Sequence, residues 1–261
     1  MNKIKHSRRK RRSTTNTTIS DSDNNRIIGG TKIDKQTQMR KYPWLSLLWF
    51  RPNPDPDPTN TQYRVDGWAG CGGTVVASNY IISAAHCLFK RACNPDTNIC
   101  YAIEEYTKDN LAWRVGDHDL GVFYETGYEW FVKIKNMHKH PDYPQKVHPD
   151  LDQCALGQCE EFIESGEYDI VVFELEEMLP LDVYTPACLP KPGEDARFDG
   201  KMATIAGWGR LSYDGPTPKE PYEVNVPVAQ TDTCPTSMIE PVKLCLGQNS
   251  PLHKGACLVG R

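Results

Sequence analysis

Two side chains in this sequence are of the types that activate a hydroxyl nucleophile. His86 stands beside Cys87, and Asp169 stands just before an apolar run. An uncharged hydroxyl is a weak nucleophile, so it needs a neutral imidazole to take its proton and a carboxylate to fix the tautomer of that imidazole. Taken singly, such a histidine is more often a packed or surface residue, and such an aspartate more often a turn or cap residue.

Short runs rich in Val, Ile, Trp, Tyr and Thr are the elements that must position these side chains. No long segment keeps a 3.6-residue period, which favours an antiparallel barrel or sandwich with few helices. Short helical pieces are expected around 84–88 and 231–238. The runs expected to be strands lie at 43–50, 73–83, 111–116, 128–137, 168–176, 201–209, 222–229 and 243–247.

Three polar stretches between these runs have little strand character. They cover 51–64, 89–110 and 141–167. The second and third each contain a closely spaced cysteine pair, which indicates a surface insertion closed by a disulfide.

The ten cysteines indicate an oxidising compartment, because thiols stay reduced in the cytosol. The alternative is a zinc site made by Cys93, Cys100, Cys154 and Cys159, although six and four intervening residues are looser spacings than usual. A second candidate metal site combines histidines and carboxylates from one region of the sequence. Its members would be His138, His140, His148, Asp142 and Asp150.

Charge and hydropathy exclude several classes of protein. Residues 27–261 carry 22 Lys and Arg against 32 Asp and Glu, a net charge of −10, which argues against a nucleic-acid partner. Residues 1–26 carry eight basic residues against two acidic ones, and the run at 8–12 suits a solvated tail, a processing site or a nuclear address. No secretory signal is visible there, and the longest apolar stretch, 44–50, is too short to span a membrane.

Several motifs in one chain order resemble the trypsin/chymotrypsin family of serine proteases (peptidase S1). The main ones are RIIGG at 26–30, CGGTVVASNYIISAAHC at 71–87 and YDIVVFEL at 168–175. The others are PWLSLL at 43–48, VGDHDL at 115–120, HPDY at 140–143, CLP at 188–190 and AGWGR at 206–210. The resemblance covers Arg26 to the end of the chain and implies an all-β fold of two antiparallel Greek-key β-barrels.

The resemblance implies a secreted serine endopeptidase made as a zymogen. His86 would be the general base and Asp169 its orienter, with the nucleophilic serine further along the chain. Cleavage between Arg26 and Ile27 would free an α-amino group that pairs with an aspartate beside that serine. The implied partners are protein or peptide substrates, an activating trypsin-like protease and protein inhibitors.

The resemblance implies no cofactor, with calcium as the one candidate ion. Oxygen ligands on one loop suit calcium, and a segment near this position binds it in some members of the family. The residues concerned are Asp117, Asp119, Glu125 and Glu129.

The resemblance also implies disulfides, which pair Cys71 with Cys87 and Cys234 with Cys245. Proximity adds Cys93 with Cys100 and Cys154 with Cys159, although four cysteines allow three connectivities. Two cysteines are left over, because the family pairs Cys188 with a propeptide cysteine and Cys257 with one beyond the serine.

The family continues after the cysteine equivalent to Cys257 with one residue and then Gly-Asp-Ser-Gly-Gly. Here Leu258, Val259, Gly260 and Arg261 follow it. We therefore expect a chain cut before the catalytic serine, inactive and with an incomplete second barrel. The alternative is a non-catalytic homologue that binds partners.

Two further expectations concern specificity and domain limits. The resemblance implies that Gly255 lies at the floor of the primary pocket, where an aspartate in some members of the family selects Arg or Lys. A glycine at this position argues against a trypsin-type preference. Residues 1–26 are expected to form a disordered leader or propeptide and 27–261 the protease domain. The expected first barrel covers about 40–187 and the second about 188–261.

Overall fold

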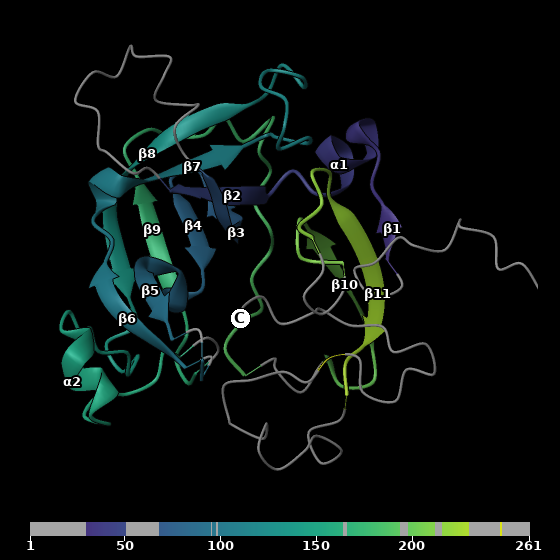
Figure 1. Ribbon diagram of the computed structural model, residues 1–261. Coiled ribbons are helices and arrows are strands. Elements are labelled where there is room, and N and C mark those ends of the chain that lie inside the picture. Colours follow the sequence, from purple (N-terminus) through teal and green to yellow (C-terminus); the bar gives the residue numbers. More distant parts are fainter. Residues whose placement is uncertain are drawn as a thin grey trace, which may run out of the picture.

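The structure is a computed structural model that describes residues 30–50, 68–94, 96–97, 99–163, 166–193, 198–211, 216–229 and 246. Strands dominate this part of the chain, and the helices are short (Figure 1). The strands are β1 (Thr31–Lys32), β2 (Leu45–Phe50), β3 (Trp68–Ala77), β4 (Tyr80–Ser83), β5 (Phe89–Cys93), β6 (Cys100–Glu105), β7 (Leu111–Val115), β8 (Trp130–Lys139), β9 (Val171–Leu175), β10 (Met202–Gly207) and β11 (Tyr222–Pro227). The helices are α1 (Lys35–Lys41), α2 (Leu151–Ala155) and the 3-10 helices η3 (Ala85–Leu88) and η4 (Lys108–Asn110).

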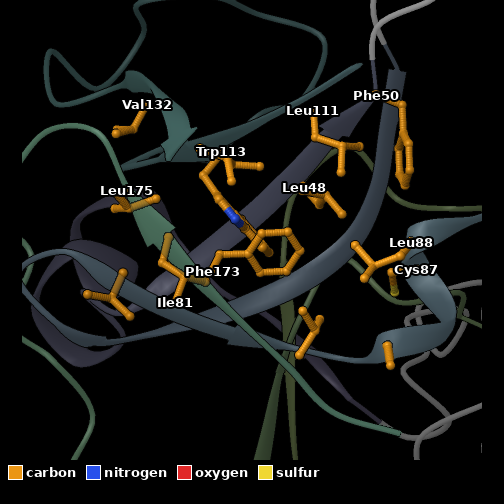
Figure 2. Close-up of a cluster of buried hydrophobic side chains, with 14 of the residues drawn as sticks. Leu48, Phe50, Ile81, Cys87, Leu88, Leu111, Trp113, Val132, Phe173 and Leu175 are labelled. Carbon is orange, nitrogen blue, oxygen red and sulfur yellow. The ribbon is translucent and has the colours of Figure 1, made fainter. Parts of the chain in front are cut away.

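Six strands form a closed antiparallel barrel in the order β2-β3-β4-β9-β8-β7. The barrel closes around its own apolar side chains, because residues that alternate along a strand point to opposite faces. In β9, for example, Val171, Phe173 and Leu175 are buried. The centre is an edge-to-face pair of Trp113 and Phe173, with ring centroids 5.0 Å apart (Figure 2). The expectation of a trypsin-like all-β fold is confirmed.

A second sheet lies beside the barrel in the order β1-β11-β10 (Figure 1). Its buried side chains, Tyr222, Val224 and Val226, alternate along β11. β1 is short, but it pairs with β11 through Thr31 opposite Glu223, and the next backbone N–H, of Ile33, donates to Pro221 at 2.9 Å. β10 and β11 fall within 188–261, the range expected for a second barrel, whereas β1 comes from outside that range.

The two remaining expected elements of that region fall almost wholly outside the described residues. The helix expected at 231–238 is outside them, and of the strand expected at 243–247 only Leu246 is described. Leu246 makes an isolated antiparallel bridge with Val228.

The expectation that 89–110 has little strand character is wrong. β5 and β6 form an antiparallel hairpin in which Cys93 faces Cys100, and within the two strands only Phe89 and Ala102 are buried. Because so few of its side chains enter the core, its sequence shows no clear alternation. Helix α2 likewise lies within the polar stretch at 141–167.

Helix α1 was not expected either, and its sequence explains why. Asp34 caps it by accepting from the Thr37 N–H at 3.0 Å, and Gln38 is its only buried residue, so there is no apolar period to detect. The buried Gln38 side chain donates to the Asp117 carbonyl at 2.5 Å and lies 2.6 Å from Nδ1 of His118. The His118 carbonyl in turn accepts from the Trp208 indole at 2.9 Å, so these contacts join α1, the barrel and the segment after β10.

Candidate functional site

Two neighbouring strands of the barrel bring His86 and Asp169 together. β4 pairs with β9 so that Ser83 faces Val171. His86 lies in η3, just after β4, and Asp169 lies just before β9, so this register puts both at the same end of the strand pair. The disulfide between Cys71 and Cys87 ties η3 back to β3.

The Asp169 carboxylate contacts His86 at two points. Oδ1 accepts from the backbone N–H of His86 at 2.8 Å, and Oδ2 lies 2.8 Å from ring atom Nδ1. An ionised carboxylate only accepts hydrogen bonds, so Nδ1 carries the proton and Nε2 is left as the base. Nε2 has no hydrogen-bond partner in the described part of the chain, and the side chains of His86 and Asp169 are 24% and 12% exposed. The arrangement can take a proton from a hydroxyl presented to Nε2.

The backbone before Asp169 has an unusual conformation. Tyr168 has φ = 56°, in the left-handed region that residues other than glycine seldom adopt. Its ring stacks on His140 with centroids 4.6 Å apart and planes 15° apart, and the His140 N–H donates to the Ile170 carbonyl at 3.0 Å. These contacts hold Tyr168 in a conformation that costs on the order of 1–3 kcal/mol. The sequence alone predicted no role for Tyr168. The feature that marks it in the sequence is its position next to Asp169.

Two other side chains near the site were also missed. The hydroxyl of Tyr143 donates to the Ile163 carbonyl at 2.9 Å, and burial, together with the charge of Asp169, raises the pKa of Tyr143 above its usual range. The Phe162 ring lies beside His86, with ring centroids 6.5 Å apart. Both come from the polar stretches, where no periodic pattern marks a buried face.

The other site residues fall into two groups. Among the described residues there are three disulfides, Cys71–Cys87, Cys93–Cys100 and Cys154–Cys159, and Cys188 is exposed and bonded to no described cysteine. Outside the described residues lie Arg26, Ile27, Cys234, Cys245, Gly255 and Cys257.

The four-cysteine zinc alternative is overturned, because its members form two separate disulfides. Nor are the histidines of the second metal alternative assembled. His138 lies 3.9 Å from Glu174, His140 lies 4.0 Å from Asp142, and the ring of His148 lies within 4.8 Å of the Cys154 and Cys159 sulfurs.

The residues considered for calcium are partly assembled. Carboxylate oxygens of Asp117, Glu125 and Glu129 lie within 4.8 Å of one another, whereas the Asp119 carboxylate accepts from the Gly121 N–H. Oε2 of Glu129 is buried and has no hydrogen-bond partner within the described ranges. Three carboxylates, one of which has a buried oxygen without a partner, fit a hard cation, so Asp117, Glu125 and Glu129 would hold the ion.

Arg114 supplies a positive charge inside this carboxylate group. Its Nε lies 2.8 Å from Oδ2 of Asp117, and both side chains are almost fully buried. The guanidinium also lies within 6 Å of the rings of Trp49, Phe123 and Phe131, which form a cation–π environment around it. Lys35 supplies a second positive charge, with its Nζ 3.5 Å from Oε2 of Glu125. Two cationic groups therefore face three carboxylates, which leaves one negative charge for a further cation when all three are ionised.

Burial raises the pKa of Asp117 to about 7, with Arg114 opposing the shift. The native state then holds this proton more tightly than the unfolded state, so this contribution to stability is full below pH ~4 and is lost as pH rises to ~7. We expect the free energy of unfolding of the parent to fall by about 3 kcal/mol more between pH 5 and pH 8 than that of Asp117→Asn, with a calcium chelator present in both cases. Urea unfolding at the two pH values measures the difference.

Millimolar calcium at pH 8 should restore part of that stability, because the ion binds the ionised native state. Glu129→Gln is the matched variant and should show a smaller gain. Equal pH dependence of the parent and Asp117→Asn would contradict the assignment of this titration.

The sequence model of the family described as Trypsin matches residues 52–257. "Venom serine protease Bi-VSP" of Bombus ignitus is 26% identical over 224 residues, which cover 84% of this chain and 49% of that protein. "Ovochymase-2" of Mus musculus is 28% identical over 209 residues, 80% of this chain and 26% of that protein. "Serine protease filzig" of Drosophila melanogaster is 26% identical over 216 residues, 80% of this chain and 10% of that protein. The chain thus spans about half the length of these relatives or less.

Within the described ranges, no helix is both long enough and apolar enough to cross a membrane.

Proposed function

Because the chain belongs to the trypsin family, we propose that it is the catalytic part of a serine endopeptidase, with His86 as general base and Asp169 as its orienter. One observation carries the proposal: a single carboxylate bonds both the backbone N–H and Nδ1 of His86. This double contact fixes the position and the tautomer of the imidazole together.

The proposed reaction begins when a serine hydroxyl attacks the carbonyl carbon of a peptide bond. Nε2 of His86 takes the hydroxyl proton as the new C–O bond forms, and Asp169 stabilises the imidazolium. When the C–N bond breaks, Nε2 returns the proton to the leaving amine. Water then repeats the sequence on the acyl-enzyme and releases the second product.

The serine and its oxyanion donors would come from the family's Gly-Asp-Ser-Gly-Gly sequence, called here the nucleophile loop. No serine among residues 1–261 stands in a Gly-x-Ser-x-Gly setting. We therefore propose that a protein of residues 1–261 is inactive by itself, and that the active form contains the nucleophile loop.

Further parts of the proposal rest on the family and the sequence. Cleavage between Arg26 and Ile27 would activate the zymogen, and Gly255 would give a primary pocket that does not select Arg or Lys. Substrates would be proteins or peptides, and regulation would come from an activating protease and protein inhibitors. The disulfides and the names of the venom relatives support secretion. The leader at 1–26 and the barrel limits at 40–187 and 188–261 are proposed with it.

A fluorophosphonate probe and the transcript test this proposal together. We expect no labelling of residues 1–261, and we expect the transcript to encode Asp-Ser-Gly-Gly in frame after Gly260. The protein expressed from that transcript should be labelled at the new serine. Labelling of residues 1–261 would reveal a different nucleophile, and a transcript that stops after Arg261 would favour a binding homologue instead.

A further inference from the structure

Two insertions lie side by side next to His86. One is the β5–β6 hairpin, and the other is the segment 141–163, which carries α2 (Figure 1). The second insertion bonds to β6 twice: the His148 N–H donates to the Ala102 carbonyl at 2.7 Å, and the Phe162 N–H donates to the Cys100 carbonyl at 2.6 Å. The two insertions therefore form one hydrogen-bonded unit.

The backbone of Phe162 and of the residue after it is held by hydrogen bonds. The next residue, Ile163, donates its N–H to Oε1 of Gln145 at 2.6 Å, and its carbonyl accepts from the Tyr143 hydroxyl at 2.9 Å. Gln145 is itself buried. With the bond to Cys100, three backbone groups of Phe162 and Ile163 are held, so the Phe162 ring is attached to a backbone with little freedom.

The ring of Phe162 lies against the imidazole of His86. The two planes are nearly perpendicular, at 89°, with centroids 6.5 Å apart, within the range of favourable aromatic pairs. On the β5 side, Cζ of Arg91 lies 5.6 Å from the Phe162 ring centroid. Within the described ranges the imidazole of His86 makes its polar contact with Asp169 alone, so Phe162 supplies an apolar neighbour for a side chain that is 24% exposed.

We propose that Phe162 is a positioning residue for His86, a role that rests on the proposed function above. Its ring opposes rotation of the imidazole away from Asp169 and keeps water from the Nδ1–H···Oδ2 bond. Exclusion of water strengthens a hydrogen bond to a carboxylate, and a fixed imidazole keeps Nε2 aimed at the hydroxyl.

The first test needs no nucleophile and uses the protein of residues 1–261. Phe162→Ala should raise the water-exchange rate of the His86 Nδ1 proton, observed by nuclear magnetic resonance, by about tenfold. Phe162→Tyr keeps the ring and should stay within about twofold of the parent. Leu156→Ala, at a site 75% exposed in the same insertion, is the matched control and should leave the rate unchanged.

Backbone amide exchange at Val132 and Leu175, in the barrel core, separates positioning from a general loss of stability. These amides should exchange at the parent rate in Phe162→Ala. If they accelerate as much as the Nδ1 proton does, the role is merely structural and the proposal fails. Phe162→Leu serves if Phe162→Ala does not fold.

The second test uses the active form that contains the nucleophile loop. Phe162→Ala should lower kcat for peptide hydrolysis by about tenfold and leave KM within about twofold. A rise in KM at constant kcat would overturn the proposal, since it would make Phe162 a substrate contact. If the parent hydrolyses no peptide while Nδ1 exchange still responds to Phe162→Ala, the proposed function fails and the positioning role stands.

Discussion

Replacement of His86 by alanine should reduce kcat of the active form by on the order of 10⁶, the cost of losing the base in a comparable triad. In the proposed mechanism no other group accepts the serine proton, because Asp169 bonds Nδ1 and leaves Nε2 of His86 as the proposed base. Asp169→Asn should cost less, about 10⁴, because the base remains but its tautomer is wrong. Steady-state hydrolysis of a peptide amide measures both effects.

Asp142→Asn is the matched control for Asp169→Asn. Its carboxylate also lies near a histidine ring, 4.0 Å from His140, but its side chain is 68% exposed. It should retain activity within about threefold of the parent, because an exposed pair contributes little. Activity of His86→Ala within tenfold of the parent would exclude His86 as the general base.

Trp113→Ala should destabilise the protein by about 3–5 kcal/mol, the usual cost of removing a buried large aromatic side chain. Trp113 is fully buried, packs edge-to-face on Phe173 and leaves no room for a side chain at Gly73, whose added Cβ would lie 2.4 Å from the indole. The cavity would open in the middle of the closed barrel (Figure 2). Urea unfolding at fixed pH measures the loss.

Trp113→Phe is the variant that separates volume from polarity. The indole nitrogen of Trp113 is buried without a hydrogen-bond partner in the described part of the chain, so phenylalanine removes an unsatisfied donor and keeps a ring against Phe173. The loss of stability in Trp113→Phe should be at most about half of that in Trp113→Ala. Val122→Ala, at a site 45% exposed, should change stability by less than about 0.5 kcal/mol. Equal losses for Trp113→Ala and Val122→Ala would contradict the assignment of Trp113 to the core.

The barrel strands could be predicted because each buries alternate apolar residues, as β9 does with Val171, Phe173 and Leu175. His86 and Asp169 could be singled out because their motifs are local in sequence. The left-handed Tyr168 and the ring of Phe162 could not, because both depend on contacts with distant residues, His140 and Cys100. The β5–β6 hairpin escaped prediction because few of its side chains enter the core, so its sequence shows no clear alternation.

The attachment of β1 to β11 limits how far a new chain end could travel. Thr31 is fixed opposite Glu223, and four residues, 27–30, separate it from the proposed cleavage bond. A fully extended chain spans at most about 3.5 Å per residue, so the amino group released at Ile27 lies at most about 14 Å from Thr31. Any carboxylate that receives this ammonium must therefore lie within that radius, on the side of the molecule occupied by the second sheet.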